Sequence, residues 1–471
     1  MIIRTALLDR KRYQLAPDVI NNNKNLFTVI IGINGAGKSR LLSKISDTII
    51  RVQPNNFGVD DELPKALAKQ IDAYDKGQYF SIYSRANARY SYLGSENRSG
   101  IDKSFNTKLI SVTTSPFDKF PVISKRTSTF KYHDDDRYHY IGLRVSENSY
   151  NKSNFLNLLT RSFLKNGVNT KQKQVLDLLG YSLPVTLSFK DKVCVYSWDV
   201  LKFKEGNLSK EDKRAKFLSF LSKNSPTLYA NIASKGAELV DEVSDAYFKE
   251  HSYISKSCSV GVDFETNKNL RLLLDVGVIQ VDDIIMGRKE RKVSIGDASS
   301  GETCILLTIL NIAGVIKNNS VICIDEPEIS LHPEWQKNFM SLLISTFENF
   351  KGCHFIISTH SPTVISELSE ENCYILAMNE KGGEFQSSEN FKNKSADYQL
   401  AELFDAPGSN NEYLNRVVVS LLTSLSKNGK LNKEERKEAK KLVLLSQKLE
   451  EDDDVKSLIG ILELGLEKTK K

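Results

Sequence analysis

The sequence lacks the features of a membrane-anchored or disulfide-stabilised protein. Its six cysteines include no CxxC pair, which argues against a zinc or dithiol site. No apolar run approaches the roughly 20 residues of a membrane span, and residues 1–4 are not followed by the apolar core of a signal peptide. We therefore expect a soluble, cytoplasmic protein without a membrane partner. Four cysteines lie in apolar surroundings and are expected as reduced core residues: Cys194, Cys304, Cys323 and Cys353.

Patterns typical of nucleases and of long helical rods are also missing. The six histidines form no His-Asn-His arrangement, and no constellation of paired acids follows residue 360. No stretch sustains heptads over the length of a long coiled coil. A net charge of +6 over 471 residues is compatible with nucleic acid but decides nothing alone. We expect two or three structural units in a chain of this length. We also expect that the chain is not itself a nuclease.

A phosphate-binding loop follows an early buried strand. Residues 26–31 are apolar and lead into GINGAGKS, after which Leu41 and Ile45 recur at helical spacing. Backbone N–H groups of such a loop surround phosphates, Lys38 reaches the β and γ phosphates, and Ser39 is available to Mg²⁺. This strand, loop and helix predict ATP binding. The expected contacts are Gly32, Asn34, Gly35, Ala36, Gly37, Lys38, Ser39 and Arg40.

The segment SSGE precedes an apolar run that predicts a helix to about residue 316. A helix start with two hydroxyls and a glycine suits a phosphate, because the first N–H groups lack partners within the helix. Taken alone, SSGE also fits an ordinary helix cap with a nearby glutamate. The nucleotide contacts predicted here are Ser299, Ser300, Gly301 and Glu302.

Two more strands end in groups suited to phosphate chemistry. Residues 321–324 read as a strand buried on both faces that ends at Asp325 and Glu326. Asp325 and Ser39 are expected to hold Mg²⁺, and Glu326 is expected to orient the attacking water. Residues 354–357 predict a neighbouring strand that brings His360 within reach of a γ-phosphate. Glu326 and His360 are therefore the predicted catalytic residues.

Together these motifs resemble the cassette ATPases. The resemblance rests on a Walker A loop at 32–39, the SSGE signature, a Walker B strand at 321–326, a D-loop analogue at 330–333 and the switch histidine His360. The phrases DEPEISLHP and STHSP are typical of the soluble RecF/OLD-like branch. The resemblance covers roughly residues 1–145 and 290–380. It implies an α/β fold: an ABC-type P-loop ATPase head with a mixed sheet, a mainly helical insertion and a helical C-terminal tail.

The sequence departs from the cassette pattern at two places. The strand at 109–114 ends without the glutamine that contacts metal and water in that family, leaving Ser115 or Asp118 as substitutes, or a simple capped turn. LHP replaces the usual D-loop residues. A looser resemblance, carried by TTSPFDKF, YIGLR and YQLAELF, is to ATPase subunits of Septu-type anti-phage systems, also found in some retrons.

The two resemblances imply a function and its rivals. They imply an ATP- and Mg²⁺-dependent ATPase that closes against a second copy of itself and controls a separate HNH-type nuclease in anti-phage defence. DNA or RNA is a further candidate partner. The alternatives are a RecF-like DNA repair ATPase, a nucleotide-bound structural scaffold and a transporter-type ATPase. The last of these needs a membrane partner and usually a coupling glutamine, neither of which is indicated.

The expected organisation has two halves of an ATPase head around an insertion. Residues 1–147 and 294–400 would form the head, 148–293 the insertion, and 401–471 a tail suited to partner docking. Basic residues gather at 210–216 and 288–292, as a phosphate-backbone surface or as ordinary solvated faces. Helices are expected at 60–76, 155–166, 175–179, 211–223, 228–249, 413–426, 433–449 and 455–468, and β-structure at 184–189 and 193–198.

Overall fold

The computed structural model describes most of the 471-residue chain. It describes residues 1–471 except 22, 52–67, 76–77, 85–90, 96–106, 116, 122–136, 143, 147–148, 151–152, 195–208, 257, 260–263, 290, 330, 367, 369–370, 380–381, 392–393, 405 and 469–471. Most of the β-structure expected at 193–198 lies outside these residues, as does Ser330 of the D-loop analogue.

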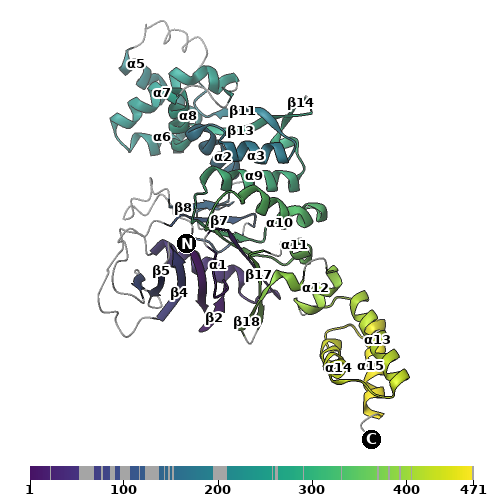
Figure 1. The fold of residues 1–471 in the computed structure, drawn as a ribbon. Helices are drawn as coiled ribbons and strands as arrows, with labels where there is room; N and C mark the ends of the chain where they lie inside the picture. Colours follow the sequence, from purple (N-terminus) through teal and green to yellow (C-terminus); the bar gives the residue numbers. More distant parts are fainter. Residues whose placement is uncertain are drawn as a thin grey trace.

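A seven-stranded sheet forms the centre of the molecule (Figure 1). Its order is β18-β17-β3-β16-β15-β7-β8, and every pair is parallel except β17 with β18. The inner strands are continuous apolar runs because helices or a second sheet cover both faces. This confirms the predicted α/β fold with a mixed sheet. The strands are β3 (Leu26–Gly32), β7 (Leu109–Thr113), β8 (Tyr138–Ile141), β15 (Val321–Asp325), β16 (His354–Ser358), β17 (Cys373–Asn379) and β18 (Gly382–Ser387).

One face of the central sheet packs on α1 (Lys38–Arg51) and on an antiparallel sheet of order β2-β1-β4-β5-β6. Leu41 and Ile45 of α1 share a core with Ile30 and Ile356 of the central sheet. Their spacing on α1 places both side chains on the same face of the helix. The antiparallel strands are β1 (Ile2–Leu8), β2 (Lys11–Gln14), β4 (Ala68–Asp75), β5 (Gln78–Ser84) and β6 (Ser91–Ser95).

The helix expected at 60–76 is wrong over residues 68–75, which form β4. Ile71 and Ala73 are buried while Asp72 and Tyr74 are only partly so, which is the period of a strand. Asp72 accepts hydrogen bonds from Thr5 Oγ1 at 2.8 Å and Ser81 Oγ at 2.7 Å on the two neighbouring strands. The many charged residues of this segment favour a solvent-exposed helix, whereas Asp72 has hydrogen-bond partners on both neighbouring strands.

The other face of the central sheet packs on α9 (Ser300–Val315) and α10 (Pro333–Phe347). Phe27 and Phe355 stack with ring centroids 4.7 Å apart, and Phe347 of α10 lies 5.6 Å from Phe355. Farther from the sheet, α9 contacts α2 (Ser153–Asn166) and α3 (Thr170–Leu178), so one continuous core joins the sheet to the insertion. The short helix α11 (Pro362–Ser366) follows β16 and contacts α10.

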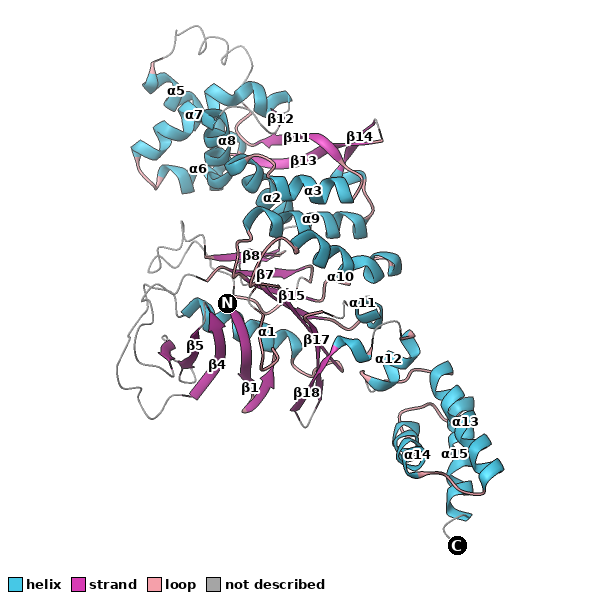
Figure 2. Ribbon diagram, viewed as in Figure 1, coloured by secondary structure: helices cyan, strands magenta, loops and turns pink. Residues whose placement is uncertain are grey.

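The insertion combines helices with a four-stranded sheet of order β12-β11-β13-β14 (Figure 2). The single helix expected at 228–249 is two helices, because the chain turns at Gly236, whose φ is +103°. Cys194 is exposed, contrary to the expectation of a core residue. The elements after α3 are β11 (Ser182–Asp191), α5 (Lys210–Asn224), α6 (Pro226–Ala233), α7 (Ala237–Lys256), β12 (Cys258–Ser259), α8 (Phe264–Val276), β13 (Ile279–Arg288) and β14 (Arg291–Ser294).

The C-terminal helices have a hydrophobic core of their own and extend away from the head (Figure 1). Asn411 and Asn432 cap two of them, and Gly429 ends α13 in the left-handed conformation that glycine favours. No helix in the described part of the chain is long and apolar enough to cross a membrane. The elements are α12 (Ala396–Glu402), α13 (Glu412–Asn428), α14 (Lys433–Ser446) and α15 (Asp454–Lys468).

Candidate nucleotide-binding and hydrolytic site

Three adjacent parallel strands bring the predicted site residues to one edge of the central sheet. β16 lies between β3 and β15, and Ile30, Ser358 and Asp325 stand level with one another across the three strands. Because parallel strands end at the same edge, the phosphate-binding loop, the DE pair and the THSP segment all begin there. The strand order therefore places His360 between the loop and Glu326.

The phosphate-binding loop needs glycine for two separate reasons. Gly32 has a φ of +152°, and a Cβ on it would lie 2.6 Å from the carbonyl oxygen of Met378 on the neighbouring strand. Gly37 has a φ of +99°, a left-handed conformation that other residues adopt only under strain. Asn34 and Gly35 are exposed, and Ala36 N–H donates to the Ile33 carbonyl at 3.1 Å. The exposed loop ahead of α1 fits a phosphate group.

Lys38 is the first residue of α1 and is buried, with 4% of its surface exposed. It donates to the carbonyls of Gly32 at 2.9 Å and Ile33 at 3.4 Å, and lies 3.3 Å from His360 Nδ1. Burial lowers the pKa of Lys38 to about 8, against the opposing influence of nearby carboxylates, first among them Glu326. A cation held this way is available to a phosphate at the loop.

The predicted metal ligands lie together. Burial raises the pKa of Asp325 to about 6, and hydrogen bonds from the hydroxyls of Ser358 and Ser39 oppose that rise. Mg²⁺ prefers oxygen ligands and is commonly held by one or two protein groups together with substrate phosphates. A buried carboxylate and an adjacent hydroxyl at the loop fit this ion. Asp325 and Ser39 are the residues that would hold it.

Glu326 faces His360 across the end of β16. Its Oε1 lies 3.4 Å from His360 Nε2, and this contact, with Lys38 nearby, lowers the pKa of Glu326 despite partial burial. The backbone of Glu326 is left-handed at φ +50°, and its N–H donates to the Ser358 carbonyl at 3.0 Å. A non-glycine residue in this conformation costs on the order of 1–3 kcal/mol. The lowered pKa makes Glu326 an ionised acceptor beside His360.

The sequence motifs did not predict two site residues, which connect the loops after β15 and β16. Glu328 Oε1 accepts the backbone N–H of His360 at 2.5 Å, and burial raises the pKa of Glu328. Gln336 of α10 accepts Ser361 Oγ at 2.8 Å and donates to the Leu331 carbonyl at 3.0 Å. The third acid of DEPE was a visible signal for Glu328. No local signal marks Gln336, because its partners are distant in sequence.

The signature segment lies at the start of α9 and faces the insertion. Ser299 is the N-cap and accepts the Glu302 N–H at 3.2 Å, which confirms the ordinary capping interpretation. The contact of this segment with a nucleotide stays a prediction. The Glu302 carboxylate lies 2.7 Å from Arg288 Nη1 and accepts from Tyr181 OH at 3.0 Å. The Arg288 guanidinium also lies 5.0 Å from the centroid of the Tyr181 ring. Glu302 therefore links the signature helix to β13 of the insertion.

Other sequence candidates have structural partners. Asp118 accepts Phe120 N–H at 2.9 Å and Tyr140 OH at 2.8 Å, and Ser115 Oγ accepts Phe117 N–H at 3.2 Å, which is the capped turn. Exposed Arg40 pairs with Asp9 at 2.9 Å. In the basic segment at 210–216, Lys213 pairs with Asp245 at 3.3 Å and Arg214 pairs with Asp241 at 3.7 Å, both acids lying on α7. These ion pairs make the segment less suited to binding a phosphate backbone.

The motifs of this site occur in a known family. The model of the AAA ATPase domain family matches residues 17–365, which is most of the chain and includes the loop after β3, the DE pair and the THSP segment. The chain belongs to this ATPase family. The match begins before β3 and ends within α11, so it also spans the insertion.

Curated relatives of this ATPase-family chain include two from retrons. The Retron Vc95 probable ATPase of Vibrio cholerae serotype O1 biovar El Tor is 25% identical over 458 residues, covering 88% of this chain and 81% of the relative. The Retron Ec83 probable ATPase of Escherichia coli is 30% identical over 134 residues, or 26% of this chain, and the chain spans only 24% of that relative's length.

Solved structures resemble the chain at low similarity. The SMC head domain from Thermotoga maritima has a TM-score of 0.36 at 11% identity, covering 82% of this chain and 99% of that one. The Smc head domain of Pyrococcus furiosus, bound to the C-terminal domain of ScpA, has a TM-score of 0.31 at 14% identity, covering 82% and 96%. The assignment of the fold rests on the strand order and the loop geometry described above.

Proposed function

We propose that the chain is an Mg²⁺-dependent ATPase that regulates an anti-phage defence complex. The observation that carries the ATPase assignment is the meeting of Lys38, His360 and Glu326 at the carboxyl ends of three adjacent strands. A cation for phosphate, an ionised acceptor and a polar ring between them suit the positioning and charge stabilisation by which enzymes transfer phosphoryl groups. Membership in the AAA ATPase domain family supports the same reaction.

Each residue has a distinct part in the proposed reaction. Lys38 binds the β and γ phosphates, and the backbone N–H groups at the start of α1 orient them. Glu326 accepts a proton from the water that attacks the γ-phosphorus, so that ATP and water give ADP and phosphate. His360, whose ring nitrogens lie near both groups, donates to a γ-phosphate oxygen. Asp325 and Ser39 would hold Mg²⁺, which would neutralise charge on the phosphate oxygens.

We further propose that the site is completed by a second copy of the chain. The signature helix starts beside the insertion, and Glu302 is held there by Arg288 and Tyr181. In the cassette arrangement, the N-terminus of this helix meets the nucleotide of another protomer, where its N–H groups face the γ-phosphate. ATP would then join two protomers head to tail, with Ser299, Ser300 and Gly301 of one facing the loop of the other.

The proposed biological context is defence against phage, with DNA cutting done by a separate HNH-type nuclease subunit. Its support is the similarity to two proteins named as retron probable ATPases, one of them over 88% of this chain. The described residues contain no group of three or more His, Cys, Asp or Glu side chains placed to hold a metal ion. The assignment of ATP hydrolysis to this chain and of DNA cutting to a separate subunit comes from the resemblance to Septu-type systems.

Phosphate release from the purified chain tests the ATPase assignment. Lys38→Ala should abolish ATP binding in equilibrium titration while circular dichroism shows an unchanged fold. Glu326→Gln should bind ATP but turn over about 10²–10⁴-fold more slowly, because a positioned general base contributes that much. Asp282, which is exposed on β13, provides the matched control Asp282→Asn with wild-type turnover. Near wild-type turnover in Glu326→Gln would assign the base elsewhere.

The same preparation separates the proposal from its rivals. A structural scaffold predicts tight ATP binding without phosphate release from the wild-type chain, alone or with its nuclease partner. For the defence assignment, the chain with Mg²⁺ should leave duplex DNA intact, and cleavage should require the nuclease subunit. Metal-dependent cleavage by this chain alone, lost on substitution of one of its own acids, would contradict the assignment of cutting to a separate subunit.

A further inference from the structure

Helix α14 carries a basic stripe opposite its buried face. Ala439, Leu442 and Leu445 are buried in the core of the C-terminal helices. A second set of positions, spaced three and four residues apart, lies along a different line of the helix and begins with cations before changing to apolar residues. This set is Lys433, Arg436, Lys437, Lys440, Val443 and Leu444.

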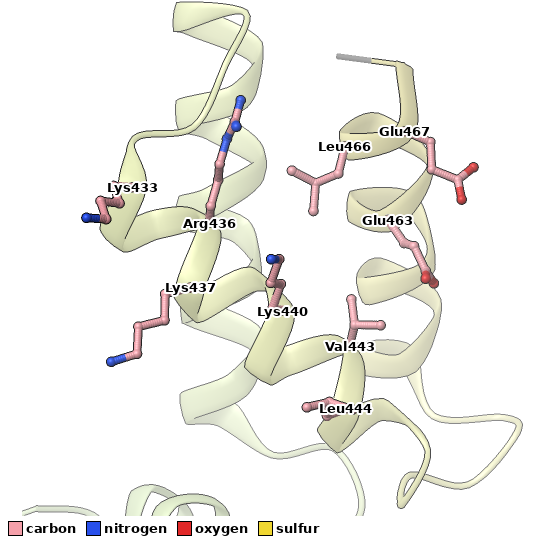
Figure 3. Close-up of a pocket in the computed structure, with 9 residues that line it drawn as sticks. All are labelled: Lys433, Arg436, Lys437, Lys440, Val443, Leu444, Glu463, Leu466 and Glu467. Atoms are coloured by element: carbon pink, nitrogen blue, oxygen red, sulfur yellow. The ribbon is translucent and has the colours of Figure 1, made fainter. Parts of the chain in front are cut away.

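These residues form one wall of a groove between α14 and α15, with a volume of about 680 Å³ (Figure 3). Leu466 lies toward the other side of the groove, where Glu463 and Glu467 form the rim. The Leu444 side chain is 65% exposed. Val443, Leu444 and Leu466 form the apolar floor of the groove, between the charged residues of α14 and α15. Grooves with apolar surface accept the apolar face of an amphipathic helix.

The basic wall is not neutralised by the described part of the chain. No ion pair within the described residues involves Lys433, Arg436, Lys437 or Lys440, whereas the neighbouring Lys441 pairs with Glu402. The acids of the opposite rim therefore leave the cations free for another carboxylate-bearing surface. Like charges along one helix face repel one another, and an acidic segment in the groove would relieve that repulsion.

We propose that this groove is a docking site for an amphipathic helix of a partner protein, with an apolar stripe and an acidic flank. The stripe would cover Val443, Leu444 and Leu466, and the acidic flank would lie along the basic wall of α14. A nucleic-acid backbone fits less well, because it offers no apolar surface to the floor and the Glu463 rim would repel phosphate. The inference goes beyond ATP hydrolysis and does not depend on it.

Fluorescence polarisation on the full-length chain tests the inference with two designed helical peptides of 18 residues. Both carry leucines at positions i, i+3, i+4 and i+7; one has a flank of glutamates and the other has lysines at the same positions. The acidic peptide should bind at least tenfold more tightly. Lys437→Glu/Lys440→Glu should weaken it at least tenfold and strengthen the lysine peptide, a reversal that loss of folding cannot produce.

The matched control is Lys427→Glu/Lys430→Glu, which makes the same charge change at exposed residues outside the groove. It should leave both affinities unchanged within twofold. Equal binding of the two peptides, or unchanged binding of the acidic peptide to the groove variant, would overturn the proposal. Displacement of the peptide by a 20-nucleotide DNA strand would also overturn the proposal and would assign the groove to nucleic acid. A change in the sedimenting mass of the groove variant would overturn it too and would assign the groove to a second copy of the chain.

Discussion

Glu328 offers a direct test of how the site is held together. Its carboxylate accepts the His360 backbone N–H at 2.5 Å, and His360 lies 3.4 Å from Glu326 and 3.3 Å from Lys38. Glu328 is not placed to contact phosphate itself in the proposed reaction. If it fixes the loop that carries His360, removing its carboxylate should reduce turnover while sparing most of the ATP binding.

The size of the effect follows from the hydrogen bond that is lost. A hydrogen bond to a charged group contributes roughly 1.5–3 kcal/mol and a neutral one about 0.5–1.5. At about 1.4 kcal/mol for each factor of ten in rate, Glu328→Ala should lower kcat about 10- to 100-fold. Glu328→Gln keeps an acceptor without the charge, so its loss should be about 2- to 10-fold. KM should change less than kcat in both variants.

Steady-state phosphate release across a range of ATP concentrations gives both constants. Glu334→Ala is the matched control, because Glu334 is an exposed acid in the first turn of α10 and near Glu328 in sequence. It should behave like the wild type. The reasoning fails if Glu328→Ala retains wild-type kcat, or if the alanine and glutamine variants lose the same activity. A rise in KM with unchanged kcat would instead assign Glu328 to ATP binding.

Two further predictions concern stability and coupling. Burial lowers the pKa of His354 to about 3, and its Nδ1 accepts the Ile3 N–H at 3.1 Å. Its neutral form therefore stabilises the fold above the unfolded pKa of about 6.5, and this stability is lost as pH falls toward 3. In urea titrations, the free energy of unfolding of His354→Gln should decline less steeply with falling pH than that of the wild type. Arg288→Ala should slow ATP turnover severalfold at unchanged ATP affinity by releasing Glu302, and Lys292→Ala should not; equal turnover in both variants would exclude the coupling.

The elements that the sequence predicts well are those with strong local patterns. The apolar runs of β3, β15 and β16 have no amphipathic alternative, and the glycines at 32, 35 and 37 allow one kind of turn before a helix. From those strands alone the meeting of Lys38, Glu326 and His360 could be expected. Their order in the sheet comes only from the structure, which places β16 between the other two.

The elements that the sequence does not predict depend on distant partners. β4 is a strand because β1 and β5 flank it and supply hydrogen-bond partners to Asp72, none of which is visible in its own composition. The same holds for Gln336, whose partner Ser361 is 25 residues away in sequence. The link from Glu302 to Arg288 likewise joins the signature helix to the insertion through a contact that no motif encodes.

The measurement that bears most directly on the central claim is ATP turnover in a mixture of two inactive variants. Lys38→Ala removes the phosphate-binding cation, and Ser300→Arg places a bulky cation at the first residue of α9. If one protomer's signature completes another's site, equimolar mixing should restore up to about one quarter of wild-type turnover, because half of the pairs are mixed and each has one intact site. No recovery, with mixed pairs demonstrated by a tag on one variant, would contradict a site shared between protomers.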